Sequence, residues 1–403
     1  MVNRFFKKNF MAAILFIIFI FIFSGLNLFV SYKPIVECLN NAKTSNSSMR
    51  DTIKDLETTI NENVFERYKF IDGYGYIQRL MGKNEESNFE VIKDEQGLSH
   101  YTFFADKPNP VKEIARRTIA FSKNVETSQK KFIYLMPPDK YIEGITKFPT
   151  GIPYNYANET ADNFLEELKK SNISTIDLRD GLNNSGIPDD EIFFKTDHHW
   201  RIPTVFWEYG KLVEKLNNDY GLKLDESGFY RNKENYNIIK YNNVYIGSMG
   251  RKAGVYYSGI DDFTLIYPKF KTDYEFYAKT GEQESKLQGR FEDALLAVYP
   301  LRVRKDTYAL EADKYFSYLY GNQGVVHVKN KEVLDGPKFL FIKDSLTVPL
   351  AAFLSTVSSD IYLIDPRYYK EDIVDFAKQV DVDFVFMAFY PQNLVKEFFP
   401  FYE

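Results

Sequence analysis

The feature that most constrains this chain is an apolar run near its N-terminus. Arg4, Lys7 and Lys8 come first, and the stretch from Phe10 to Val30 that follows carries no charged side chain. As an α-helix rising about 1.5 Å per residue, this stretch is roughly 30 Å long, which is the thickness of a bilayer core. The basic residues on its short side place the rest of the chain outside the cytoplasm, by the positive-inside rule. We therefore expect residues 1–31 to form an N-terminal transmembrane anchor.

A cleaved signal peptide is the alternative interpretation of the same run. Signal peptides usually have a shorter apolar core followed by small residues at the cleavage site, and no such site stands clearly after this run. The anchor is the favoured interpretation, and both interpretations export the rest of the chain. Residues 32–66 are then expected to form a polar linker and a juxtamembrane amphipathic helix, because apolar residues fall at helical spacing from Ile53 to Val64.

The body of the chain, residues 67–403, alternates between strand-like and helix-like patterns. Short apolar runs predict buried strands, and the amphipathic stretches between them predict helices. The strands are expected at residues 131–136, 175–178, 338–343, 360–364 and 383–389, and the helices at residues 111–127, 161–170, 204–217, 349–356 and 370–379. This order predicts an α/β fold with a mostly parallel sheet flanked by helices. Residues 224–332 break the rhythm, and we expect a cap or insertion beside the sheet there.

The composition excludes several other classes of protein. The chain has 56 acidic and 51 basic residues and a net charge of -5, which gives no electrostatic reason to expect a nucleic-acid partner. Cys38 is the single cysteine, so neither an intramolecular disulfide nor a cysteine-rich zinc site can form. The 4 histidines leave little material for a histidine-based metal centre.

The densest cluster of reactive side chains is the segment FFKTDHHWR, residues 193–201. Asp197 and His199 are separated by one residue, so in an extended loop both side chains point the same way and His198 points away. A carboxylate can hold an imidazole by one ring nitrogen and leave the other as a general base. A metal site is one alternative, but adjacent histidines diverge and the two remaining histidines show no ligand spacing, so no metal is expected. A buried polar turn is the other alternative, since Asp-x-His alone is a short signal.

A candidate nucleophile follows the strand expected at residues 338–343. The strand ends at Asp344 and Ser345, and a helix is expected to follow. A serine at this junction lies where ligands bind in open α/β sheets. Backbone N–H groups and the helix dipole can stabilise an oxyanion there. The G-x-S-x-G elbow of α/β-hydrolases is absent, and a helix N-cap is the structural alternative for Ser345. The conjunction with Asp-x-His favours the catalytic interpretation.

Two more polar residues follow strands of the same expected sheet. Arg367 comes after residues 360–364, and Tyr390 comes after residues 383–389. In a parallel sheet both lie along the same rim as Ser345, where each can donate to an acyl oxygen or a substrate carboxylate. A surface ion pair for the arginine and a core-capping position for the tyrosine are the alternatives.

Four motifs together resemble a known family. They are TDHHW at residues 196–200, GSMGRKAGVYY at 247–257, IKDS at 342–345 and IDPRYY at 364–369. This set resembles the DHHW proteins, which are SGNH-hydrolase-like and similar to the exported alginate O-acetylation proteins. The resemblance covers most of the chain beyond the apolar run, and TDHHW is its most specific motif.

The resemblance implies a catalytic triad of Ser345 as nucleophile, His199 as base and Asp197 as the residue that orients the base. The order along the chain, with Asp-x-His before the serine, matches this permuted branch of the SGNH hydrolases. Two departures leave the oxyanion hole unassigned: Lys343 stands where a typical G-D-S motif has glycine, and separate Gly and Asn blocks are not evident.

The expected function is that of an exported O-acetyltransferase acting on a cell-surface or secreted polysaccharide. The resemblance implies that a multi-spanning membrane O-acyltransferase supplies the acyl group, since an exported domain has no access to cytoplasmic acyl-CoA. No cofactor is expected. The alternatives are an acyl esterase, a D-alanyl-transfer protein of teichoic-acid modification, and a non-catalytic scaffold that binds polysaccharide or a membrane partner.

Overall fold

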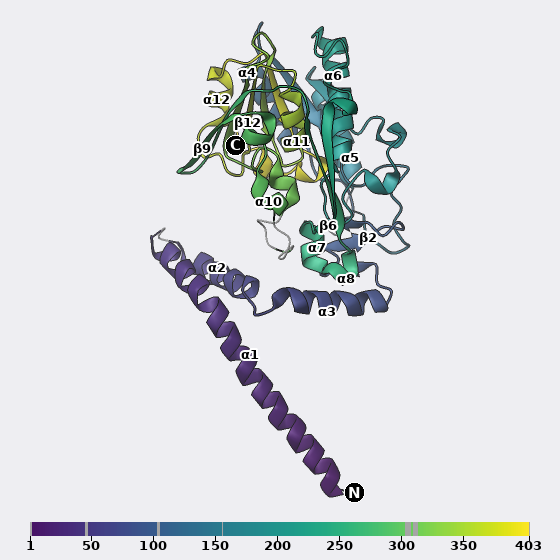
Figure 1. The fold of residues 1–403 in the computed structure, drawn as a ribbon, viewed down its shortest axis with the longest axis vertical. Helices are drawn as coiled ribbons and strands as arrows, with labels where there is room; N and C mark the ends of the chain where they lie inside the picture. The colour runs from purple at the N-terminus through teal and green to yellow at the C-terminus, as the bar shows by residue number, and fades with distance from the viewer. Residues whose placement is uncertain are drawn as a thin grey trace. The chain divides into compact units, whose positions relative to one another are not determined.

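The protein divides into two compact units (Figure 1). The units are Met1–Tyr74 and Gly75–Glu403. The computed structural model describes residues 2–44, 47–102, 105–154, 156–302, 308 and 313–402.

The first unit consists of the long helix α1, the helix α2 and the beginning of α3. Helix α1 spans Val2–Thr44, α2 spans Met49–Glu62 and α3 spans Arg67–Leu80. The part of α1 from Lys8 to Thr44 is long and apolar enough to cross a membrane, with a mean hydropathy of 2.7 in its most apolar window. The helix continues well beyond residue 31, so residues 32–44 are helical where the sequence predicted a linker. The expected amphipathic helix is α2.

Two hydrogen bonds join α1 to the residues at the C-terminal end of α2, and a cap begins α2. Ser31 Oγ donates to Asn63 O at 2.9 Å, and the Phe65 N–H donates to Asn27 Oδ1 at 2.9 Å. Helix α2 starts at a serine N-cap, where Ser48 Oγ accepts from the N–H of Asp51 at 3.2 Å. Two polar residues of α1, Asn27 and Ser31, therefore bind the segment at the end of α2.

The second unit is built on an eight-stranded sheet in the order β5-β4-β13-β11-β12-β10-β8-β9. The first five strands in this order are parallel to one another, and the last three are antiparallel to their neighbours. Their bounds are β4 Lys131–Met136, β5 Ser174–Asp177, β8 Tyr274–Thr280, β9 Gln283–Gly289, β10 Val325–Asn330, β11 Lys338–Lys343, β12 Asp360–Ile364 and β13 Phe384–Ala388. The predicted α/β fold with helices around a largely parallel sheet is confirmed.

Helices cover both faces of this sheet, and the alternating side chains of the strands divide into two cores. On β11, Phe339 and Phe341 pack with the residues of α6 and α11, while Leu340 and Ile342 pack with those of α4, α5 and α12. Strands buried on both faces read as continuous apolar runs, as KFLFIK does. The helices are α4 Lys112–Val125, α5 Ala157–Lys170, α6 Ile202–Tyr220, α11 Thr347–Leu354 and α12 Ile373–Gln379.

The cap expected over residues 224–332 is only partly a separate structure. Three of its strands, β8, β9 and β10, extend the main sheet instead of lying beside it. The rest of the segment contains an antiparallel pair, β6 Tyr236–Tyr245 with β7 Asp261–Pro268, and the helices α7 Ser248–Ala253, α8 Val255–Ser258, α9 Phe291–Ala294 and α10 Val298–Arg302. Part of the segment, residues 303–307 and 309–312, lies outside the described residues.

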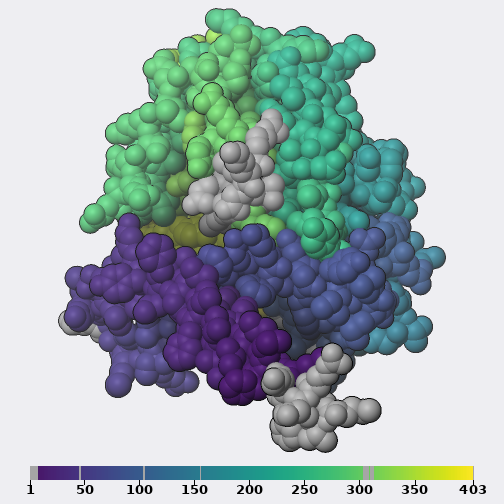
Figure 2. Space-filling view, turned by 60° about the horizontal axis from the view of Figure 1, so that its bottom comes forward, coloured from purple at the N-terminus to yellow at the C-terminus, as the bar shows by residue number. Residues whose placement is uncertain are grey.

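A small sheet of three strands packs against α7 and α8. It consists of β1 Glu85–Glu86, β2 Val91–Lys93 and β3 Ser99–Tyr101. Val91 forms an apolar cluster with Met249, Ala253 and Tyr257, and Lys93 Nζ donates to Tyr257 O at 2.6 Å. Figure 2 shows the two segments, blue and green-teal, next to each other on one face of the molecule. This contact supports α8 and α7, the helix that begins at Ser248.

Candidate active site

The structure brings the three predicted triad residues into one hydrogen-bonded line. His199 Nδ1 lies 2.7 Å from Asp197 Oδ1, and His199 Nε2 lies 2.7 Å from Ser345 Oγ. The side chains come from segments far apart in the sequence, the bend after β5 and the turn after β11, and all three are buried. With the Nδ1 proton directed at the carboxylate, Nε2 faces the serine hydroxyl as a proton acceptor.

The turn that carries Ser345 is fastened by the residue before it. The carboxylate of Asp344 accepts from the N–H of Leu346 at 3.0 Å, from the N–H of Tyr390 at 2.8 Å and from Asn393 Nδ2 at 3.0 Å. Helix α11 has Leu346 at its N-cap position and no side-chain cap. The N-cap alternative for Ser345 is therefore wrong: its hydroxyl is bonded to His199 while Asp344 holds the turn.

Asp197 is bound by donors on both oxygens. Oδ1 accepts from the His199 backbone N–H at 3.1 Å as well as from the ring, and Oδ2 accepts from Tyr245 Oη at 2.9 Å and from the Ser248 N–H at 2.8 Å. Burial acts to raise the pKa of this carboxyl, but the charges and hydrogen bonds of His199 and His198 hold the pKa well below its usual range. Asp197 is therefore an anion that can stabilise an imidazolium.

The pKa of His199 is lowered to about 4, first by burial and then by the neighbouring charge of His198, against the opposing effect of Asp197. The imidazole is consequently neutral at neutral pH, which is the form that a general base requires.

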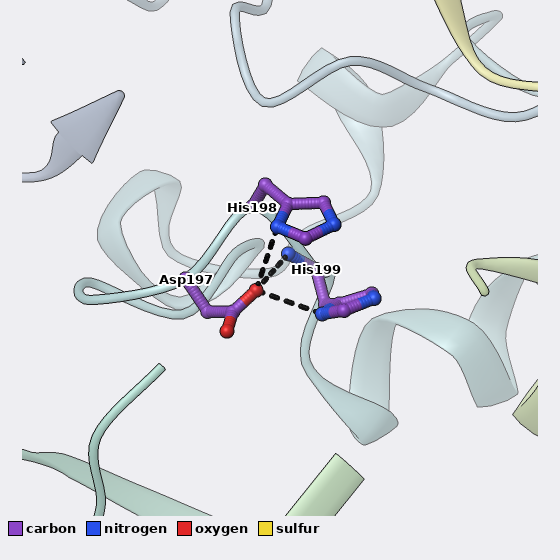
Figure 3. A group of neighbouring side chains, drawn as sticks. All are labelled: Asp197, His198 and His199. Carbon is purple, nitrogen blue, oxygen red and sulfur yellow. Dashed lines mark hydrogen bonds and ion pairs between the residues drawn. The ribbon is translucent and has the colours of Figure 1, made fainter. Parts of the chain in front are cut away.

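His198 does not point away, as the alternation argument predicted. Its Nδ1 lies 3.0 Å from Asp197 Oδ1 and 3.2 Å from Ser248 Oγ, and its ring centroid is 4.0 Å from that of His199 (Figure 3). The reason is that residues 195–199 form a bend and not an extended strand. Both imidazoles therefore approach the same carboxylate oxygen.

Asp197, His198 and His199 also form a group whose ligand atoms lie within 4.8 Å of one another (Figure 3). The geometry is that of hydrogen bonds, because each ring directs Nδ1 at the same carboxylate oxygen and His199 directs Nε2 at Ser345. These contacts engage both ring nitrogens of His199.

Gly247, the first residue of the GSMG motif, has a steric role at the site. A Cβ on Gly247 would collide with the side chain of Asp197, and a Cβ on Gly250 would come within 2.8 Å of Thr196 Cβ. The backbone of Gly247 also donates to Thr196 Oγ1 at 2.8 Å. Helix α7 can thus approach the bend at residues 195–199 closely enough for the Ser248 N–H to bind Asp197 only because these two positions lack side chains.

Sequence reasoning missed the aromatic wall of the site. The ring of Tyr315 stacks on that of His199, with centroids 3.8 Å apart and planes inclined by 20°. Tyr315 Oη donates to Leu346 O at 3.2 Å and accepts from Trp200 Nε1 at 3.0 Å. Tyr245 was missed as well. Both tyrosines lie in the stretch expected to be a cap, where a high content of tyrosine gave no signal for any one of them.

Arg367 and Tyr390 lie on the rim as predicted, and both are partly engaged by protein groups. Arg367 binds Asp365 through Nε at 2.9 Å and Nη2 at 2.7 Å, and Lys343 Nζ lies 3.1 Å from the same carboxylate. Tyr390 is buried, its N–H donates to Asp344, and its ring stacks on His198 at 5.9 Å. Lys343, which replaces the usual glycine, is thus part of a buried ion pair.

A cavity of about 460 Å³ opens at the same edge of the sheet, at the ends of β4 and β5. Its lining includes Asp139, Tyr141, Arg179 and Asp180. Asp139 is joined to the segment after Tyr390 by a hydrogen bond of 2.8 Å from Gln392 Nε2. One residue of the cavity lining is therefore bonded to the segment that follows Tyr390 on the rim.

Comparisons with known proteins agree with this architecture. The family model of the SGNH hydrolase-like domain, acetyltransferase AlgX, matches residues 102–203, which include Asp197 and His199 but not Ser345. This match confirms the resemblance inferred from the motifs. No curated protein sequence matches the chain.

Solved structures with the same fold cover most of this chain. A DHHW family protein from Eubacterium siraeum has 17% sequence identity and a TM-score of 0.56, over 76% of this chain and 91% of that one. Bacillus cereus PatB1 with a sulfonyl adduct has 18% identity and a TM-score of 0.61, over 78% of this chain and 98% of that one. The body of the chain has the SGNH-hydrolase-like fold.

Proposed function

We propose that this chain is an extracytoplasmic, serine-dependent O-acetyltransferase that acts on a cell-surface or secreted polysaccharide. The observation that carries the proposal is the hydrogen-bonded line Asp197–His199–Ser345, with a neutral imidazole beside a buried serine hydroxyl. The family model that matches residues 102–203 describes an acetyltransferase domain, which favours acetyl transfer among the reactions that such a triad can perform.

In the first half of the reaction, Ser345 Oγ attacks the carbonyl carbon of an acetyl ester. His199 Nε2 takes the hydroxyl proton as the C–O bond forms, and Asp197 stabilises the resulting imidazolium. The tetrahedral intermediate collapses when the imidazolium returns this proton to the leaving alcohol. Ser345 then carries the acetyl group as an ester.

In the second half, a sugar hydroxyl replaces the leaving alcohol. His199 takes the proton of that hydroxyl while its oxygen attacks the acetyl-serine carbonyl, and the proton returns to Ser345 Oγ as the new ester leaves. Water in place of the sugar would give hydrolysis, so the alternative of an acyl esterase differs only in the acceptor. Arg367 and Tyr390 are the rim residues that we propose to contact the substrate or its oxyanion.

The partners follow from an exported position of the domain. Helix α1, with Arg4, Lys7 and Lys8 before its apolar run, anchors the chain with its body outside the cytoplasm. Acyl-CoA is absent there, so a membrane-bound O-acyltransferase supplies the acetyl group. The cavity beside Asp139 and Tyr141 is the proposed place for the polysaccharide acceptor. The reaction needs no cofactor.

The experiment is incubation of the protein with an activated acetyl ester, with and without glycan acceptors, followed by mass spectrometry. The peptide containing Ser345 should gain the mass of one acetyl group, and an acetylated glycan should appear only when the acceptor is present. Ser345→Ala should form no adduct. Release of free acetate that no glycan diverts would instead identify an esterase. An active Ser345→Ala protein would contradict the serine-dependent mechanism, and a parent protein that forms neither adduct nor acetylated glycan would leave the non-catalytic scaffold as the better hypothesis.

A further inference from the structure

The bend that carries Asp197 and His199 is held by one buried ammonium group. Lys140 Nζ donates to the backbone carbonyls of Phe194 at 2.5 Å, Lys195 at 3.1 Å and Asp197 at 2.9 Å. Lys140 is only 4% exposed. Its three N–H donors are therefore all used by the segment that positions the triad.

A buried carboxylate holds the same segment through its N–H groups. Asp261 accepts from the N–H of Lys195 at 2.7 Å and from the N–H and Oγ1 of Thr196 at 2.8 and 2.6 Å. Asp261 is 2% exposed and begins strand β7. The bend thus lies between the Lys140 ammonium, which donates to its carbonyls, and the Asp261 carboxylate, which accepts from its N–H groups.

This arrangement explains why the alternation argument failed at His198. In an extended segment successive carbonyls point in opposite directions, so the carbonyls of residues 194 and 195 cannot both reach one ammonium. We propose that Lys140 and Asp261 are positioning residues for the proposed reaction: together they impose the bend that places the Asp197 carboxylate and the His199 ring in line with Ser345. The inference rests on the proposed function for its kinetic consequences, but not for the geometry.

The chain contains a matched control elsewhere. Lys130 is also buried, and its Nζ donates to three carbonyls at the end of α12, those of Ala377 at 2.8 Å, Lys378 at 3.1 Å and Val380 at 2.7 Å. It makes no contact with the triad among the described residues. Lys130→Met and Lys140→Met therefore remove the same kind of interaction, and only the second removes it from the catalytic bend.

The test compares the two variants in the full-length protein. Lys140→Met should lower the rate of acetyl-Ser345 formation by about 100-fold, since misplacement of reacting groups by about 1 Å costs this much, and should shift the acid limb of its pH profile. Lys130→Met should stay within about threefold of the parent. In NMR spectra, the downfield resonance of the His199 Nδ1 proton should be lost in Lys140→Met and retained in Lys130→Met.

The inference would be overturned if a folded Lys140→Met protein kept the acylation rate, the pH profile and the His199 resonance of the parent. If Lys140→Met does not fold, Asp261→Asn gives the same test, because the amide keeps the shape of the carboxylate but cannot accept from all three donors. A parent protein that forms no acetyl adduct would contradict the proposed function alone. The comparison of the His199 resonance would still decide the role of Lys140.

Discussion

At His199 the two ring nitrogens face different partners. Nδ1 is directed at Asp197 and Nε2 at Ser345, while Tyr315 covers one face of the ring. Burial lowers the pKa of the ring to about 4, so the neutral base is populated throughout the neutral range. In the proposed reaction, the ability of His199 to act as a base therefore depends on geometry above that pH and on protonation below it.

The two adjacent histidines should differ in their effects on the reaction. His199→Ala removes the base and should lower acetyl-Ser345 formation by on the order of 10⁴-fold. His198→Ala leaves the base in place and should stay within about tenfold at neutral pH. Because the charge of His198 lowers the pKa of His199, its loss should raise that pKa and move the acid limb of the pH–rate profile to higher pH. Equal losses in both variants, with the fold retained, would contradict this division of roles.

Tyr315 should act through its ring more than through its hydroxyl. Tyr315→Phe keeps the face that stacks on His199 and loses hydrogen bonds to Trp200 and Leu346, so it should cost about 1 kcal/mol of stability and little activity. Tyr315→Leu loses the stacked face and should lower the acylation rate by about tenfold, since such aromatic contacts are worth about 0.5–1.5 kcal/mol. Stopped-flow acylation and thermal unfolding of both variants measure the two effects. Identical rates for Phe and Leu at this position would refute the role of the ring.

The approach of helix α7 to the site depends on Gly247, which has no side chain. Gly247→Ala would place a methyl group against Asp197, and overpacking of this kind typically costs about 1–3 kcal/mol. The variant should melt at a lower temperature and acylate more slowly, because either Asp197 or Ser248 must move. Gly73→Ala is the control: this glycine lies within α3 with no atom within 4 Å of its added Cβ, and the change should stabilise the helix by about 0.5–1 kcal/mol. A Gly247→Ala protein as stable and active as the parent would show that the bend is pliable.

The same elements show what the sequence could and could not predict. Strands β4, β11 and β12 begin and end at the residues expected, because each is a short apolar run buried on both faces. Strand β9 was missed because its QESKLQG pattern is polar and mostly exposed at the edge of the sheet. Its membership in the sheet depends on pairing with β8, which local pattern does not reveal.

The candidate site also has features that the sequence predicted and features that it did not. Residue type and position relative to a strand end were enough to select Ser345, and the Asp-x-His spacing was enough to select its partners. The direction of His198 was not predictable, since it depends on Lys140 and Asp261, which lie more than 50 residues away on either side of the bend. Long-range contacts of this kind carry no signature in the spacing of a single sequence.

At the scale of the whole chain, the apolar helix and the proposed reaction of the body are linked by the supply of the acyl donor. A domain outside the cytoplasm needs an acyl donor that has crossed the membrane, and a chain anchored by α1 is confined to the surface where such a donor emerges. In the proposed function, anchoring would raise the concentration of the protein near its proposed supplier without requiring any additional binding site.

The orientation of the chain should follow from Arg4, Lys7 and Lys8, which precede the apolar run. A reporter that works only outside the cytoplasm, fused after Glu403, should be active, and protease added to intact spheroplasts should digest the body, because basic residues on the short side are retained inside. A variant lacking residues 1–44 is the control, since its reporter should remain inside and silent. A second variant, with the three basic residues replaced by glutamate, should lose part of the exported signal because the charge bias is gone. A body protected from protease until the cells are lysed would place the triad in the cytoplasm, and it would remove the reason for a membrane-borne acyl donor.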